Sequence, residues 1–165
     1  DSLLYWTEKD STSAFGNVHM IQLTRQLQSE NFSFWKTNGY RKSSFNAKGN
    51  CTLQDDLRTI KAFNIIYNDD NQLMTMNQNC IVYERDRGLS GNQINIQYAD
   101  SLIDTLSVFG NATAYNDLKV KISDTSLENQ HFRDNMSSSN MKTIFFENQI
   151  EVNGVIHFKS FSDGF

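Results

Sequence analysis

The sequence predicts an α+β fold, in which an N-terminal amphipathic helix and a short second helix pack on an antiparallel β-sheet that ends in a hairpin. Two observations predict this class. Apolar residues recur at helical spacing in two segments before residue 63, and they alternate with polar residues after it. With 165 residues, 38% of them hydrophobic, the chain can bury one sizeable core. We expect a single domain over 1–165, and no internal repeat is apparent.

The first helix is expected over residues 13–30. Apolar residues fall at positions 14, 18 and 21, and again at 20, 23 and 27, which is the spacing of one helix face. Ser11 and Ser13 offer N-caps. Asp10 and Arg25 lie near the ends at which the helix dipole favours their charges.

A second helix is expected over residues 52–62. Thr52 and Asp55 match the S/T-x-x-[DE] pattern of a helix start. One face at i, i+4 and i+7 carries Leu53, Leu57 and Ile60.

An antiparallel sheet is expected over residues 63–161. Its predicted strands are 63–67, 72–77, 80–84, 92–98, 118–122, 144–152 and 155–161. Residues 68–71 form the first turn, and Asn153-Gly154 forms the last, which is the strongest short hairpin signal. Residues 102–109 are open between a strand and a short helix, and 123–140 are expected to form a long surface loop.

The connector at 31–50 combines aromatic and basic residues without an acid. Interleaved rings and cations suit a glycan or single-stranded nucleic acid. The candidate binding residues are Trp35, Lys36, Tyr40, Arg41 and Lys42. In the alternative, the rings of Phe32, Phe34, Trp35 and Phe45 cover the sheet while the basic side chains extend to solvent.

Cys51 and Cys80 are the chain's two cysteines. We expect a disulfide between them, which would close a loop of about 30 residues and contribute roughly 3.5 kcal/mol. Such a bridge would place the protein outside the cytoplasm. The alternative is two free thiols that serve as small core residues.

Composition excludes several function classes. The net charge of −4 gives no field that draws the protein to nucleic acid, and no apolar run is long enough to span a bilayer. No nucleophile elbow, phosphate loop or dinucleotide motif is present. We therefore expect no enzyme and no cofactor.

Metal ligation is not expected either. His19, His131 and His157 lack ligand spacing, and the sequence has no Cys/His cluster. The oxygens of residues 68–71 could suit calcium, but a hairpin turn is the better interpretation because the glycine and distal glutamate of a calcium loop are missing. Asp100 and Asp104 would form a carboxylate pair only on a helix, and solvated surface charge is favoured.

Residues 53–63, LQDDLRTIKAF, are similar to a stretch of type IV minor pilins. LIDTLSVFG at 102–110, LKVKIS at 118–123 and IFFENQIEVNG at 144–154 resemble the late strands of that family. The sequence thus resembles the soluble part of a type IV minor pilin or type II secretion pseudopilin, although their apolar N-terminal segment is missing. The resemblance implies an assembly subunit that docks neighbours through its helix.

The expected function is an extracytoplasmic, non-enzymatic interaction or assembly module, in its sharpest form a pilin-like minor subunit. Its partners would be proteins or neighbouring subunits, with a glycan or nucleic acid at 31–50. The alternative is a free secreted ligand-binding or adhesion domain, and an enzyme of unrecognised type is the third hypothesis.

Overall fold

Every described element of the computed structural model is a β-strand. The structure describes the backbone of residues 2–6, 10–37, 42–85, 87–100, 102–121, 129–144, 149–153 and 157–162, and the side chains of 4, 10–36, 42–85, 87–100, 102–115 and 136–142. The strands are β1 (Ser2–Trp6), β2 (Ser11–Gln22), β3 (Arg25–Thr37), β4 (Lys42–Gln54), β5 (Arg58–Asn68), β6 (Leu73–Glu84), β7 (Arg87–Ala99), β8 (Leu102–Lys121), β9 (Asn129–Ile144), β10 (Gln149–Asn153) and β11 (His157–Ser162).

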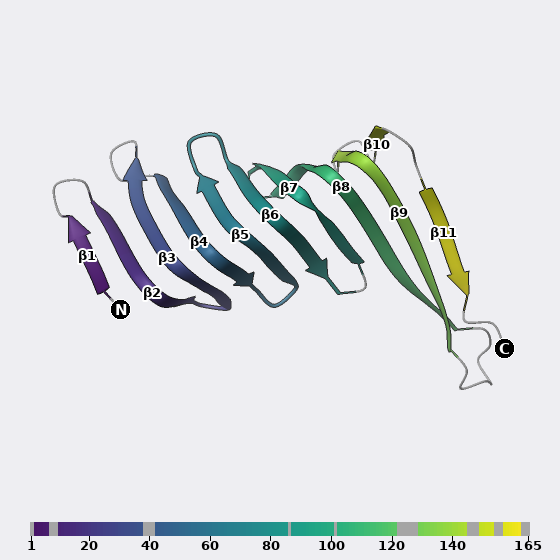
Figure 1. The fold of residues 1–165 in the computed structure, drawn as a ribbon, viewed down its shortest axis with the longest axis horizontal. Helices are drawn as coiled ribbons and strands as arrows, with labels where there is room; N and C mark the ends of the chain where they lie inside the picture. The colour runs from purple at the N-terminus through teal and green to yellow at the C-terminus, as the bar shows by residue number, and fades with distance from the viewer. Residues whose placement is uncertain are drawn as a thin grey trace.

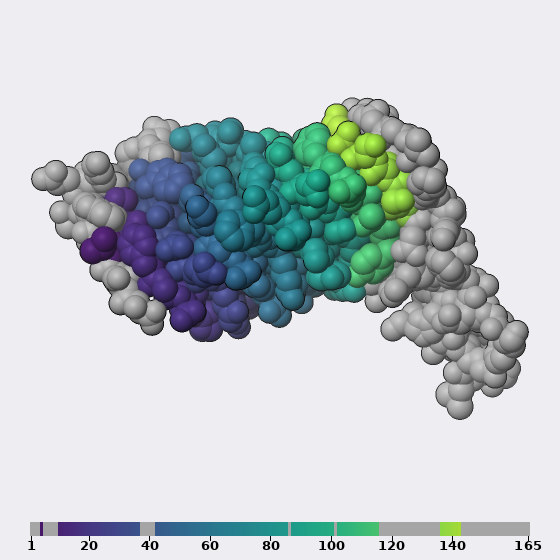
Figure 2. All heavy atoms as spheres, in the orientation of Figure 1, coloured from purple at the N-terminus to yellow at the C-terminus, as the bar shows by residue number. Residues whose placement is uncertain are grey.

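The strands form one antiparallel sheet of 11 strands, in which each strand from β1 to β10 pairs with the next along the chain (Figure 1). At its far end β9 pairs with both β10 and β11, through Asn140–Ile144 and Phe132–Ser137 respectively. Successive hairpins therefore follow one another along the long axis of the molecule, as the colour sequence of Figure 2 shows.

The even-numbered strands β2, β4, β6 and β8 each bend at a β-bulge. In each bulge two consecutive residues have positive φ and face a single residue on the following strand. These pairs are Gly16-Asn17, Gly49-Asn50, Gln78-Asn79 and Gly110-Asn111. Glycine and asparagine are the residues that adopt this conformation at least cost, so the sequence itself specifies the bends.

The bends turn the inner face of the sheet toward itself, and the core lies between the two halves. β5 contributes Ile60 before the bend and Ile65 after it to the same buried cluster, and β4 contributes Ala47 and Cys51. The full cluster of buried apolar residues is Leu27, Phe32, Ala47, Cys51, Ile60, Ala62, Ile65, Met74, Met76, Cys80, Val82, Ile94, Ile96, Leu106, Val108, Ala112 and Met141.

The α+β prediction is wrong, because both expected helices are strands in the structure. Residues 13–30 form most of β2 and the start of β3, with a turn at Leu23-Thr24. Residues 52–62 span the end of β4 and the start of β5. The apparent helix cap there is a turn, since the Asp55 carboxylate accepts the backbone N–H groups of Leu57 and Arg58 at 2.9 and 2.8 Å.

Some of the other predicted elements are confirmed by the structure, and others are wrong. The hairpin of 63–67 and 72–77 is confirmed within β5 and β6, and the strand at 92–98 within β7. The connector 31–50 is regular, since it belongs to β3 and β4 wherever it is described. The expected surface loop at 123–140 is wrong for 129–140, which lies in β9.

The expected last hairpin is also wrong in its pairing. β10 and β11 do not pair with each other within the described residues, because each pairs with β9. Gly154 of the predicted turn lies outside the described residues. No helix among the described residues is long and apolar enough to cross a membrane. The single-domain division of 1–165 stays a prediction.

Candidate binding cavity

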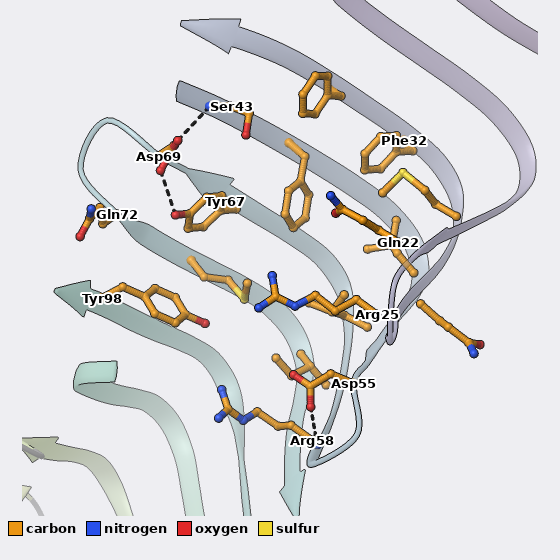
Figure 3. Close-up of a pocket in the computed structure, with 18 of the residues that line it drawn as sticks. Gln22, Arg25, Phe32, Ser43, Asp55, Arg58, Tyr67, Asp69, Gln72 and Tyr98 are labelled. Carbon is orange, nitrogen blue, oxygen red and sulfur yellow. Dashed lines mark hydrogen bonds between the residues drawn. The ribbon is translucent and has the colours of Figure 1, made fainter. Parts of the chain in front are cut away.

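A cavity of about 530 Å³ lies between the two halves of the bent sheet, among β2 to β8 (Figure 3). Most of its apolar lining comes from positions that face inward on their strands, whereas Leu102 and Ile103 are consecutive residues at the start of β8. The apolar lining side chains are Met20, Leu27, Phe32, Phe34, Phe45, Leu53, Ile60, Met74, Leu102 and Ile103. The volume falls in the range of about 300–1,000 Å³ that is typical of small-molecule sites.

A row of aromatic rings crosses one half of the sheet along the cavity. Phe32 and Phe45 stack with ring centroids 5.9 Å apart, and Phe45 lies 5.9 Å from Tyr67. Tyr67 and Tyr98 meet edge to face at 6.2 Å. The row therefore joins β3, β4, β5 and β7 by contacts that favour a fixed apolar wall.

Charged side chains lie on the rim of the cavity on the side of the β2–β3 and β4–β5 turns. Arg25, Asp55 and Arg58 line the cavity at the ends of β3, β4 and β5 (Figure 3). Arg58 makes a long ion pair with Glu84, with 3.9 Å between Nε and Oε2. The bend places this rim opposite a second rim at the other ends of the strands. The second rim carries the polar side chains of Ser43 and Asp69.

Asp69 organises the opposite rim. Its Oδ2 accepts the backbone N–H of Ser43 at 2.9 Å, and its Oδ1 accepts the Tyr67 hydroxyl at 3.1 Å. Its own backbone N–H donates to the Ser44 hydroxyl at 3.1 Å. These bonds fix the β5–β6 turn against the start of β4.

Both tyrosines of the aromatic row keep their protons at neutral pH. Burial, followed by the hydrogen bond with Asp69, raises the pKa of Tyr67 to about 12. Burial also raises the pKa of Tyr98, while the positive charges of Arg58 and Arg25 act in the opposite direction. A neutral phenol is a hydrogen-bond donor, so Tyr98 presents a donor to the rim with the arginines.

The predicted disulfide is wrong, since Cys51 and Cys80 are free and buried. They lie on β4 and β6 with β5 between them. Neighbouring strands are about 4.8 Å apart, so the two backbones are separated by about 10 Å, beyond the reach of a disulfide. The alternative, in which both serve as small core residues, is the observed arrangement. The cysteines therefore give no argument for compartment.

The candidate patch at 31–50 is only partly described. Trp35 is half-buried on β3, next to Lys36, whose Nζ pairs with the Asp10 carboxylate at 3.1 Å. Lys42 lies across the β4–β5 pair near Asp70, with 3.9 Å between Nζ and Oδ1. Tyr40 and Arg41 lie outside the described residues. In the alternative, the aromatic rings of this segment face inward. Three of them, those of Phe32, Phe34 and Phe45, line the cavity.

Among the side chains that the structure describes, the remaining candidates do not assemble into a reactive site. His19 is exposed on β2, whereas the side chains of His131 and His157 lie outside the described residues. Asp104 lies on a strand, so the helical pairing considered for it with Asp100 does not arise. Where side chains are described, no group of three or more His, Cys, Asp or Glu could hold a metal ion.

Residues 68–71 form a turn, as expected. The Asn68 carboxamide accepts the backbone N–H of Asp70 at 2.9 Å. With both Asp69 oxygens also engaged, the oxygens considered for calcium serve the turn itself.

Sequence reasoning did not single out the rim residues Arg25, Asp55, Arg58 and Tyr98. The signal that could have found them is their spacing from buried positions. In the order given, they lie two residues from the inward-facing Leu27, Leu53, Ile60 and Ile96. In a strand, residues two apart share a face, so a charged residue at this spacing points into the cavity.

Comparison with known proteins gives a family and a fold. Residues 1–101 match the family model described as LptA/(LptD N-terminal domain) LPS transport protein. The solved structure of LptH from Pseudomonas aeruginosa, described as the LptA homologous periplasmic component of the conserved lipopolysaccharide transport device, aligns with a TM-score of 0.54. It is 5% identical, and the alignment covers 82% of this chain and 93% of LptH. A search of curated proteins gives no match.

These findings overturn the pilin hypothesis. The residues of the helix that should dock neighbouring subunits form β2 and the start of β3 instead, and the family model is not that of a pilin. The resemblance of residues 53–63 was misleading because it follows a helical pattern that the structure does not contain. The pilin-like subunit and the adhesion domain are therefore both wrong.

Proposed function

The chain belongs to the family of LptA and the LptD N-terminal domain, LPS transport proteins, and on that premise we propose that its cavity holds the apolar part of LPS during transport. The observation that carries the proposal is the apolar cavity of about 530 Å³ between the halves of the bent sheet. The matched residues 1–101 contain all of its lining except Leu102 and Ile103.

An extracytoplasmic location, protein partners and a non-enzymatic role agree with this family. The finer location that we propose is the periplasm, supported by the shared fold with LptH, a periplasmic component. A transport role needs no reaction at the cavity, only an apolar surface that a lipid can enter and leave. Burial of apolar area then supplies a hydrophobic free energy of about 25 cal/mol per Å² that favours binding.

A variant that fills the cavity tests the proposal. Leu53 is half-buried and lines the cavity, so Leu53→Trp should reduce the space for an acyl chain. We expect the wild type to displace an environment-sensitive apolar dye when LPS is added, and the Leu53→Trp protein to do so at least several-fold less tightly. Thermal unfolding of both proteins checks that the variant is folded.

Tyr83→Trp is the matched control, because Tyr83 is exposed and the preceding residue on β6, Val82, faces the core. The same enlargement on the outer face should leave LPS affinity unchanged. Absence of LPS binding by the wild type, or equal affinity in a folded Leu53→Trp protein, would contradict the proposal.

Glycan or nucleic-acid binding at Trp35, Lys36, Tyr40, Arg41 and Lys42 stays a prediction. The half-buried Trp35 and the ion pair of Lys36 leave this face less available than the sequence implied. Oligonucleotide and anionic glycan titrations of wild-type and Trp35→Ala proteins test it, and unchanged affinity would dismiss the patch.

A further inference from the structure

We infer that Arg25, Arg58 and Tyr98 form an anion-binding subsite on the rim of the cavity, which takes the phosphate group of an acylated ligand. The inference rests on the proposed function, since it assigns a place to the head group of a ligand whose apolar part lies in the cavity. It adds the residues that would distinguish an anionic amphiphile from a neutral one.

The strand register places both guanidinium groups on the cavity side. Arg25 precedes the buried Leu27 by two residues on β3, and Arg58 precedes the buried Ile60 by two residues on β5. β4 lies between these strands, and Leu53 pairs with both Leu27 and Ile60. The backbones that carry the arginines are thus about 10 Å apart, and their long side chains can converge on one phosphate between them.

The protein uses the hydrogen-bond donors of these arginines only in part. No ion pair of Arg25 is present among the described residues, and Arg58 has only the 3.9 Å pair with Glu84. The Nε of Arg58 is buried and has no hydrogen-bond partner. A buried donor without a partner costs free energy that a ligand oxygen would recover.

The acids near the arginines are already engaged. Asp55, between the two strands, accepts the backbone N–H groups of Leu57 and Arg58. On the opposite rim both oxygens of Asp69 accept protein hydrogen bonds. With Asp55 and Glu84 counted fully charged, the charges of the four side chains sum to zero, so the subsite rests on the unused donors of the arginines and not on an excess of charge.

Tyr98 completes the subsite from the other half of the sheet. Figure 3 shows its ring opposite Arg25 and Arg58, and their charges act on its ionisation. The backbone N–H of Tyr98 donates to the Gln72 carbonyl at 2.9 Å, which holds the end of β7 in place. A protonated hydroxyl and two guanidinium forks together offer the donors that a phosphate accepts.

Phosphate suits this geometry because each guanidinium can present two parallel N–H groups to its oxygens. The apolar Leu27 and Ile60 begin immediately beyond the arginines, so a ligand held there continues into the cavity. A phosphate attached to an alkyl or acyl chain satisfies both features, whereas free phosphate satisfies only the first.

Calorimetric titration with dodecyl phosphate, dodecyl maltoside and inorganic phosphate tests the subsite, with each amphiphile kept below its micelle concentration. The wild type should bind dodecyl phosphate about tenfold or more tightly than dodecyl maltoside at low salt, and inorganic phosphate much more weakly. Arg25→Gln and Arg58→Gln should each weaken dodecyl phosphate about tenfold and leave dodecyl maltoside unchanged, as expected for one charge-assisted contact.

Lys61→Gln is the matched control, because Lys61 lies on the same strand as Arg58 but is exposed between the buried Ile60 and Ala62. It should change neither affinity. Should Arg58→Gln fail to fold, Arg25→Gln and Arg58→Lys carry the test, because Arg25 is exposed and lysine retains the charge.

The outcomes separate the two proposals. Equal wild-type affinity for both amphiphiles, or a parallel loss of both in Arg25→Gln, would overturn the subsite and leave the lipid cavity intact. Inorganic phosphate that binds as tightly as dodecyl phosphate would show a free-anion site and overturn the head-group role. Binding of neither amphiphile would overturn the proposed function and the subsite with it.

Discussion

The Cys51 thiol on β4 donates a hydrogen bond to the carbonyl oxygen of Phe63 on β5, with 3.4 Å between sulfur and oxygen. Cys80 on β6 makes the same contact with Asn92 on β7, also at 3.4 Å. Each cysteine directly follows the two positive-φ residues of its strand's bulge. The two thiols therefore occupy equivalent places in successive hairpins, where a small side chain fits beneath the bend.

Thiol chemistry should reveal this burial. Burial raises the pKa of both Cys51 and Cys80 from the ordinary 9.0 to about 11, so little thiolate is present at pH 8. We expect neither thiol of the native protein to react promptly with a chromogenic disulfide reagent at pH 8, and both to react after denaturation. Loss of that reactivity in the denatured, unreduced protein would instead reveal a bridge.

A bulge and a turn explain why helices were predicted where the chain forms strands. In β2, Ala14 and Val18 lie on either side of the Gly16-Asn17 bulge and are four residues apart, which is also a helical spacing. In the second predicted helix, the spacing of Leu53, Leu57 and Ile60 spans the turn between β4 and β5. In the β2–β3 turn, Leu23 has positive φ without the glycine or asparagine that marks such turns.

Strand segments that lie away from a bulge could be predicted from the sequence. Ile94, Ile96 and Tyr98 alternate without interruption, and the turn after Tyr67 carries Asn and Asp residues, so both elements could be predicted. The cavity could not be predicted from the sequence, because it forms only when one half of the sheet folds over the other. Only that bend brings Arg25 and Tyr98, from different halves of the sheet, to one cavity.

An internal repeat also escaped detection because it is only four residues long at each occurrence. Its occurrences are Phe15-Gly16-Asn17-Val18, Lys48-Gly49-Asn50-Cys51, Asn77-Gln78-Asn79-Cys80 and Phe109-Gly110-Asn111-Ala112. The third lacks the glycine, which hides the pattern. The structure shows that all four perform the same bend.

Substitutions at the first positive-φ position of this repeat should affect stability differently in two of its occurrences. Gly49 has φ +86, and a Cβ there would meet the Glu30 side chain, so Gly49→Ala should lower the free energy of unfolding by about 1–2 kcal/mol. Gln78 has φ 64, so Gln78→Gly should be neutral or stabilising by up to about 1 kcal/mol, after the entropic cost of glycine. Urea unfolding measures both. Destabilisation by Gln78→Gly comparable to that of Gly49→Ala would argue against this account of the bends.

Two neighbouring isoleucines test which face of the sheet is the core. Ile65 is fully buried at 0% exposure, whereas Ile66 is only half-buried on the other face. Ile65→Ala should cost about 2–4 kcal/mol of unfolding free energy through lost burial and a cavity. Ile66→Ala should cost less than about 1 kcal/mol. Chemical denaturation of the two variants compares them directly, and equal losses would contradict the placement of the core inside the bend.

Alkaline pH should destabilise the protein through groups that are buried in their protonated form. The pKa of each thiol is raised from 9.0 to about 11, and that of Tyr67 from 10.0 to about 12. The unfolded chain therefore releases protons that the folded chain retains, and stability falls as pH rises from about 9. Urea midpoints between pH 7 and 11 should stay level at first and then decline. In a Cys51→Ala, Cys80→Ala protein the decline should begin about one pH unit later, because only the tyrosine contribution remains. An identical onset in both proteins would mean that the thiols ionise as easily in the folded state as in the unfolded chain.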